Sequence, residues 1–110
     1  MVLAVMFTAC VQKKHKKVIV ATLKVDNKTN VKTVGIIGGS DPLDWDNGLR
    51  MQEIIKDSLY SASFIVETGY KFLELKFTID GEPELKDGPN RRINFSDADS
   101  IFLKAVFNEQ

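Results

Sequence analysis

Cysteine, histidine and tryptophan each occur only once in this chain of 110 residues. The single cysteine, Cys10, excludes an internal disulfide and any metal site built from several cysteines. Nucleophilic catalysis needs a serine or cysteine beside a base, but the single histidine, His15, lies in a basic segment and Cys10 in an apolar one. We therefore expect a protein that is not an enzyme and that holds no metal and no cofactor.

The chain also has no excess of charge of either sign. Fifteen lysines and arginines balance fifteen aspartates and glutamates. Because nucleic-acid binding needs a positive field, and because aromatic residues do not interleave with the basic ones, we expect no nucleic-acid partner. A hydrophobic content of 44% in a chain of this length predicts one folded domain that buries its core unaided.

An apolar, uncharged stretch covers residues 1–9 and is too short to cross a bilayer as a helix. Cys10 follows it, and then the basic run of residues 13–17. This order resembles the end of a bacterial lipoprotein signal, although Phe7 stands where leucine is usual and the basic start of a secretory signal is missing. The resemblance implies lipidation of Cys10, membrane contact only through that anchor, and a place in the cell envelope or outside the cell.

The alternative for this segment is an apolar N-terminal arm or an extra strand, which would leave the protein in the cytoplasm. In either case we assign residues 1–17 to a leader and basic linker. Residues 18–110 then form a single domain.

The clearest strand pattern covers residues 72–79, where apolar residues alternate strictly with mostly polar ones. Asp80-Gly81 follows as a tight hairpin turn. The other expected strands are residues 18–25, 31–37, 59–67, 84–85, 91–95 and 101–107. Residues 49–55 fit one helical turn or a short irregular strand. This spacing, without a helix of ordinary length, predicts an all-β fold, an antiparallel immunoglobulin-like β-sandwich of about seven strands.

Four short motifs occur in order along the predicted domain. They are Val34-Gly35, Pro42-Leu43-Asp44-Trp45-Asp46, Phe72-Leu73-Glu74-Leu75-Lys76-Phe77 and Leu85-Lys86-Asp87-Gly88-Pro89-Asn90-Arg91. Their order and separation resemble the starch-binding domain attached to amylases and glucoamylases, and its glycogen-binding relatives. The resemblance extends over about residues 17–107 and implies a non-catalytic module that binds α-glucan or a related polysaccharide.

The resemblance also implies a ligand site. Trp45 would stack on the apolar face of a sugar ring, and Lys76 and Asn90 would bond to its hydroxyls, as a pyranose requires. Leu85 stands where the family has a second stacking tryptophan. We therefore expect weaker or altered binding unless Tyr70, Phe72 or another loop aromatic takes over that role.

Each of these residues also has a structural explanation. Trp45 could cover the edge of the sandwich, Lys76 could simply face water, and Asn90 is a common turn residue. Arg91 could pair with Asp87 or Glu84 across the turn. The alternative function is accordingly an accessory sandwich that has kept the fold but meets a protein partner, such as an enzyme or a surface protein, through an apolar patch near Leu85 and Trp45.

Two further patterns carry less weight. Residues 44–48 contain the acidic and amide residues of a calcium loop, but the glycine is out of register and Ile55 stands where the closing glutamate belongs. Glu82 and Glu84 could serve as a pair of glycosidase carboxylates, yet neighbouring exposed acids are common on strands.

Overall fold

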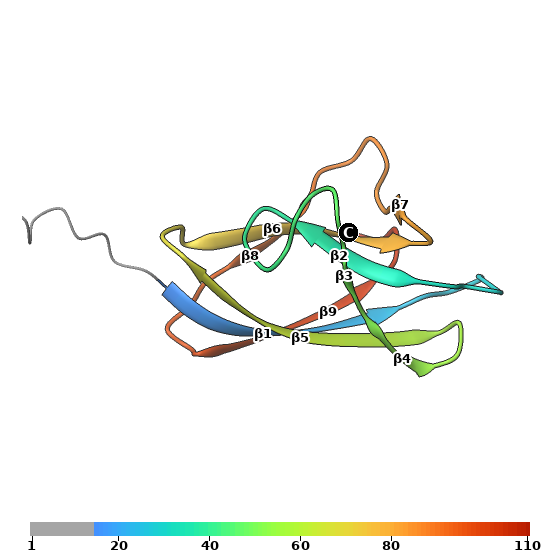
Figure 1. Cartoon of the computed structure of the whole chain (residues 1–110), viewed down its shortest axis with the longest axis horizontal. Coiled ribbons are helices and arrows are strands. Elements are labelled where there is room, and N and C mark those ends of the chain that lie inside the picture. Colours follow the sequence, from blue (N-terminus) through green and yellow to red (C-terminus); the bar gives the residue numbers. More distant parts are fainter. Residues whose placement is uncertain (1–14) are drawn as a thin grey trace, which may run out of the picture.

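The computed structural model describes residues 15–110, which form two β-sheets packed face to face (Figure 1). The strands are β1 (His15–Lys24), β2 (Val34–Gly38), β3 (Leu49–Arg50), β4 (Gln52–Ile55), β5 (Leu59–Thr68), β6 (Phe72–Ile79), β7 (Glu82–Pro83), β8 (Arg91–Asn94) and β9 (Ser100–Val106). One sheet has the order β4-β5-β1-β9. The other has the order β3-β2-β6, with both β7 and β8 paired to β6. The prediction of an all-β sandwich is confirmed.

The topology differs from the prediction in two details. The described residues form nine strands rather than about seven, because β3 and β4 are added between β2 and β5. The short strand expected at residues 84–85 is β7, which lies two residues earlier. The pairing is antiparallel except between β1 and β9, which run parallel along seven paired positions. Residues 49–55, for which a helical turn was an alternative, form the short strands β3 and β4.

The core lies between the two sheets and follows the alternation of the longest strands. In β1 the side chains of Ile19, Ala21 and Leu23 are completely buried, and in β6 the inward positions run from Leu73 to Ile79. Because successive side chains in a strand point to opposite faces, the intervening residues of β6 face outward. This outward face carries Phe72, Glu74, Lys76 and Thr78.

The first strand begins three residues earlier than expected. β1 starts at His15, so residues 15–17, assigned to a basic linker from sequence, belong to the sandwich. Lys17 is buried because its ammonium donates hydrogen bonds of 2.7 Å to the carbonyls of Ser96 and Ala98. Cys10, the lipoprotein-like segment and the rest of the predicted leader lie outside the described residues.

The hairpin turn between β6 and β7 is formed as predicted. Asp80 and Gly81 both have positive φ angles, 49° and 85°, which the twist of a two-residue hairpin requires. One carboxylate oxygen of Asp80 also accepts the backbone N–H groups of Lys32 and Thr33, at 2.9 and 2.8 Å. These two hydrogen bonds lower the pKa of Asp80 below its ordinary value of 3.8, since they favour the ionised carboxylate.

Candidate functional site

The loop that carries Trp45 connects β2 to β3 and is held against the outer side of the second sheet. Gly38 donates its N–H to the carbonyl of Asp44, and Gly39 donates to the carbonyl of Glu74 in β6. Leu43 anchors the loop, since its side chain is buried in the core. In Figure 1 this loop and the loop between β7 and β8 both rise above the same sheet.

Trp45 is partly supported and partly open to solvent. A Cβ placed on Gly39 would lie 3.5 Å from Nε1 of Trp45 and 3.7 Å from Cζ2, so the indole ring rests on the bare backbone of this glycine. The residue nevertheless remains 43% exposed. Trp45 is therefore neither a core residue nor free in solvent. An aromatic ring held from one side in this way can still stack on a ligand.

The carboxylate of Asp44 shapes the tip of the loop. One of its oxygens accepts the backbone N–H groups of Asp46 and Asn47, at 2.7 and 3.3 Å. This is the local turn that aspartate typically stabilises. The segment that has some calcium-loop residues is thus a hydrogen-bonded turn, and the described residues include no group of three or more acidic, histidine or cysteine side chains able to hold a metal ion.

The strand register places Lys76 close to the Trp45 loop. Ile37 of β2 pairs with Lys76, and Gly39, on which Trp45 rests, bonds to Glu74. Lys76 and Glu74 both point outward, so the indole lies beside Glu74. Lys76 is the next outward-facing residue of β6 after Glu74. That separation along a strand is about 7 Å.

Lys76 has a structural task that its position in the sequence did not reveal. Its ammonium donates hydrogen bonds to the carbonyls of Leu85 and Gly88, at 3.0 and 3.2 Å. These bonds tie the loop between β7 and β8 to the face of the sheet. Because an ammonium has three protons, one donor remains for a ligand.

Asn90 lies at the end of that same loop. Arg91, the first residue of β8, pairs with Leu75, so Asn90 directly precedes the paired positions, and it is exposed. Together with Leu85 and with Leu103 of β9, Asn90 lines a hollow. The structure therefore brings the Trp45 loop and Lys76 together on the second sheet, and it places Asn90 at the end of the loop that Lys76 holds.

Leu85 does not offer the missing second platform. It has a positive φ of 51°, and its N–H donates to the side-chain oxygen of Asn108 at 2.8 Å. Its side chain is half-buried and lines a hollow of about 320 Å³. The other residues that line this hollow are Pro89, Asn90, Arg91, Arg92, Leu103 and Gln110. Trp45 is not among the residues that line it, so this hollow does not connect Leu85 to Trp45.

A second aromatic group lies further along the same face. The rings of Tyr70 and Phe72 are 5.8 Å apart, and the guanidinium of Arg92 lies 3.8 Å from the centre of the Phe72 ring. Tyr70 is 66% exposed. Arg92 pairs with Glu74, and Phe72 is two residues before Glu74 in β6, so this group and Trp45 lie on either side of Glu74.

Sequence reasoning named Tyr70 and Phe72 only as substitutes for the missing tryptophan, and it did not include Arg92. The sequence feature that could have indicated this aromatic group is Phe72, because it is an aromatic residue on the otherwise polar side of the alternating strand β6.

The loop between β7 and β8 is closed underneath by a buried ion pair. Arg91 donates to both carboxylate oxygens of Glu84, at 2.6 and 2.7 Å, and Glu84 is completely buried. The carboxylate also accepts the backbone N–H groups of Phe77 and Asn108. The expectation that Glu82 and Glu84 are neighbouring exposed acids is thus wrong, because only Glu82 is exposed, and Glu84 cannot reach a substrate.

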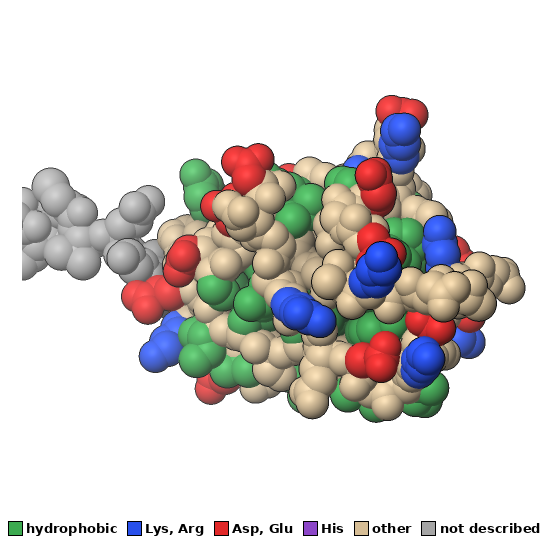
Figure 2. All heavy atoms as spheres, turned by 45° about the vertical axis from the view of Figure 1, so that its right-hand side comes forward, with side chains coloured by type: hydrophobic (Ala, Val, Ile, Leu, Met, Phe, Trp, Pro, Cys, Tyr) green, Lys and Arg blue, Asp and Glu red, His purple; other side chains and the backbone are tan. Residues whose placement is uncertain are grey.

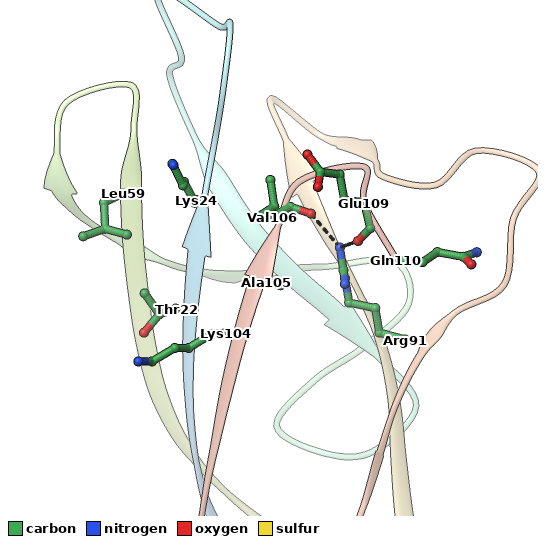
Figure 3. Close-up of a pocket in the computed structure, with 9 residues that line it drawn as sticks. All are labelled: Thr22, Lys24, Leu59, Arg91, Lys104, Ala105, Val106, Glu109 and Gln110. Carbon is green, nitrogen blue, oxygen red and sulfur yellow. Dashed lines mark hydrogen bonds between the residues drawn. The ribbon is translucent and has the colours of Figure 1, made fainter.

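Another hollow, of about 410 Å³, lies at the far end of β1 and β9 (Figure 3). It is lined in part by Thr22, Lys24 and Lys104, and by Arg91. Arg91 is already engaged there with the carbonyls of Val106 and Glu109, at 2.8 and 2.6 Å. None of the residues predicted to bind sugar lines this hollow.

Acidic and basic side chains are interspersed over the face of the molecule that Figure 2 presents. This mixture matches the balanced composition of the chain. No helix that could cross a membrane occurs in the part of the chain that the structure describes.

Comparison with known proteins adds no family to this description. No family model matches the chain, and no curated protein matches it.

Proposed function

We propose that this sandwich is a non-catalytic carbohydrate-binding module for α-glucan or a related polysaccharide. The observation that supports the proposal is that the exposed ring of Trp45 rests on Gly39 near Lys76, which itself holds the loop that ends at Asn90. An exposed ring together with a cation and an amide suits a sugar, which has an apolar face and a fringe of hydroxyls. The immunoglobulin-like arrangement implied by the resemblance belongs to the same proposal.

In this proposal the roles of the residues are unequal. Trp45 stacks on one sugar ring, and Asn90 bonds to hydroxyls from an exposed position. Lys76 contributes its remaining donor, but its main effect is to hold Asn90 in place through the bonds to Leu85 and Gly88. Tyr70 extends the surface, because a glucan chain that passes Glu74 would meet its open ring.

The direct test follows the fluorescence of Trp45, the only tryptophan, while the protein is titrated with maltoheptaose and β-cyclodextrin. We expect a saturable shift for the natural chain. Asn90→Ala should weaken it about tenfold, since one hydrogen bond to a ligand contributes about 1.5 kcal/mol. Phe102→Ser, which removes an exposed aromatic residue from the other sheet, is the matched control and should leave the titration unchanged.

Retention on insoluble starch gives a second readout for a variant without tryptophan. Trp45→Ala should lose retention while its far-ultraviolet circular dichroism is unchanged, because the ring contacts Gly39 rather than the core. No fluorescence change up to millimolar sugar, with the natural protein folded, would refute the glucan proposal.

One observation favours a second function. Leu85 is a half-buried leucine at a position of left-handed backbone, not an exposed aromatic residue. A sandwich that has exchanged the sugar for a protein partner would account for it, and the hollow beside Leu85 would be the contact surface. This function predicts no sugar response from Trp45.

The proposal includes anchoring at the cell envelope through Cys10. Only four residues separate Cys10 from β1, so a lipid on this cysteine would hold the sandwich close to the membrane surface. Mass spectrometry of the protein from a bacterial membrane fraction tests this part. An unmodified Cys10 would refute it without affecting the sugar site.

A further inference from the structure

The strand β9 is the longest strand edge that the described part of the chain leaves unpaired. It has seven residues and pairs only with β1. The other edges are protected in the usual ways, since β3 and β7 have two residues each, and the register of β4 shifts between Glu53 and Ile55. The edge strand β8 has four residues, of which two are arginines.

The backbone groups on the open edge of β9 follow from its register with β1. Val18 donates to the carbonyl of Asp99, and Phe107 donates to the carbonyl of Lys24. In a parallel pair this pattern directs the odd-numbered residues of β9 toward β1. The N–H and C=O groups of Ser100, Phe102 and Lys104 therefore point away from the sheet.

The side chains around this edge are incompletely covered. Phe102 is 71% exposed on the outer face, where it lies beside Val20 of β1. On the inner face Ile101 and Leu103 are only half-buried, whereas Ile19 in the adjacent strand is fully buried. A bare strand with apolar side chains on both faces is a site for addition of another strand.

We propose that β9 pairs with β9 of a second copy of this chain, antiparallel and centred on Phe102. In this register Phe102 faces its own counterpart, and Ser100 faces Lys104 of the second copy. All outward N–H and C=O groups of Ser100, Phe102 and Lys104 are then paired. The result is one continuous eight-stranded sheet across a twofold axis.

Two observations favour this register over those centred on Lys104 or on Ser100. Centring on Lys104 would place two lysines directly opposite each other, and it would need the carbonyl of Val106, which already accepts hydrogen bonds from Arg91 and Glu109. Centring on Ser100 would need the segment before β9, which Lys17 holds through the carbonyls of Ser96 and Ala98. With Phe102 at the centre, the two lysines are about 13 Å apart along the strands.

A second copy fits this edge because the edge is complementary to itself. The proposed pairing brings no like charges directly opposite each other, and the chain has no net charge that would repel a copy. This inference does not depend on the sugar-binding proposal, since β9 belongs to the other sheet.

Sedimentation velocity of the full chain, from micromolar to millimolar concentration and with a reductant to keep Cys10 from cross-linking, tests the proposal. We expect a reversible monomer–dimer equilibrium. Phe102→Lys places two cations opposite each other at the centre and should raise the dissociation constant at least about tenfold. Ile65→Lys also replaces an exposed apolar side chain by lysine, but on the outer face of β5. It is the matched control and should change the dissociation constant less than about twofold.

The register has its own test. Ser100→Glu places a carboxylate opposite each Lys104 and should tighten the dimer, whereas Ser100→Lys should weaken it, and added salt should reduce both effects. A chain that stays monomeric at millimolar concentration would overturn the proposal. A dimer that Ile65→Lys disrupts as much as Phe102→Lys would overturn it as well, because association would then use the sheet face and not its edge.

Discussion

Arg91 holds the completely buried carboxylate of Glu84 with two hydrogen bonds, of 2.6 and 2.7 Å. The side chain of Arg91 is itself only 13% exposed, and its guanidinium also donates to the carbonyls of Val106 and Glu109. This pair therefore joins the end of the β7–β8 loop to the C-terminal end of the chain. Arg91 directly follows Asn90, so the pair also fixes the backbone next to Asn90.

The first prediction concerns the stability that this pair provides. Arg91→Met should lower the free energy of unfolding by about 3–5 kcal/mol, because it leaves a buried carboxylate without its cation. The measurement is urea denaturation followed by circular dichroism. Arg92→Met is the matched control, since Arg92 is exposed and stacks on Phe72, and it should cost about 1 kcal/mol or less. Equal losses in the two variants would contradict this account.

The sequence could predict those parts of the fold in which one strand face is buried. The alternation around Leu75 predicted β6 correctly, and Asp80-Gly81 predicted the turn after it. Each of these patterns depends only on residues that are neighbours in the sequence. The parallel pairing of β1 with β9 was not predictable in this way, since periodicity shows which face a strand buries but not which strand lies beside it. The exposure of Glu84 was predicted wrongly for a related reason. Its carboxylate is bonded by the backbone of Asn108, which lies far along the chain, and periodicity does not predict such a contact.

The candidate site was predictable to a similar extent. Trp45, Lys76 and Asn90 were predicted from motifs. The register of β2 with β6 brings the Trp45 loop near Lys76, and the hydrogen bonds of Lys76 hold the loop that ends at Asn90. The bonds from Lys76 to the loop carbonyls were not foreseen, because they depend on the path of a loop in which Leu85 and Asp87 have left-handed backbone angles, and periodicity does not predict such a path.

A second prediction concerns Lys17, which the sequence assigned to a solvated linker. Lys17→Met should lower the free energy of unfolding by about 1.5–3 kcal/mol, since the ammonium makes two charge-assisted hydrogen bonds to the turn before β9. Methionine keeps most of the apolar stem, so the loss reports on the hydrogen bonds. Lys16→Met, at the exposed neighbouring position, should change the denaturation midpoint little. If both variants unfold at the same urea concentration as the natural chain, the ammonium of Lys17 does not stabilise the fold.

A third prediction concerns acid stability and Asp80. Its pKa is lowered in the folded chain by hydrogen bonds from Thr33 and Lys32, so the ionised group stabilises the fold above its unfolded pKa. This contribution is lost as the pH falls through the lower, folded pKa. Asp80→Asn keeps a side chain that tolerates the positive φ but removes the charge.

We therefore expect Asp80→Asn to be less stable than the natural chain at neutral pH and to approach it in acid, below the ordinary carboxyl value of 3.8. Urea denaturation midpoints measured across this range test the sign. A difference between the two proteins that is constant with pH, or that grows in acid, would show that the charge of Asp80 has no such role.

The last prediction concerns the adjacent residues Gly38 and Gly39. Variants of these two glycines distinguish the packing that holds the Trp45 loop in place from the contact between the backbone and the indole ring. A Cβ on Gly38 would lie 2.6 Å from Cδ1 of Leu43 and 2.8 Å from the backbone oxygen of Glu74, so Gly38→Ala must displace the residue that anchors the loop. We expect a loss of about 1–3 kcal/mol in the free energy of unfolding, as overpacking of a core typically costs. We also expect a shift in the tryptophan emission, because the loop moves with Leu43.

Gly39→Ala is its counterpart on the outer side of the same turn. There the new Cβ would lie 3.5 Å from Nε1 of Trp45, which is ordinary van der Waals contact, so the ring and the stability should change little. If the sugar proposal holds, Gly39→Ala should still bind maltoheptaose, while Gly38→Ala should bind it more weakly despite a tryptophan that is chemically intact. Equal binding by both variants would mean that the position of the loop does not matter for the ligand, and the stacking role assigned to Trp45 would have to be abandoned.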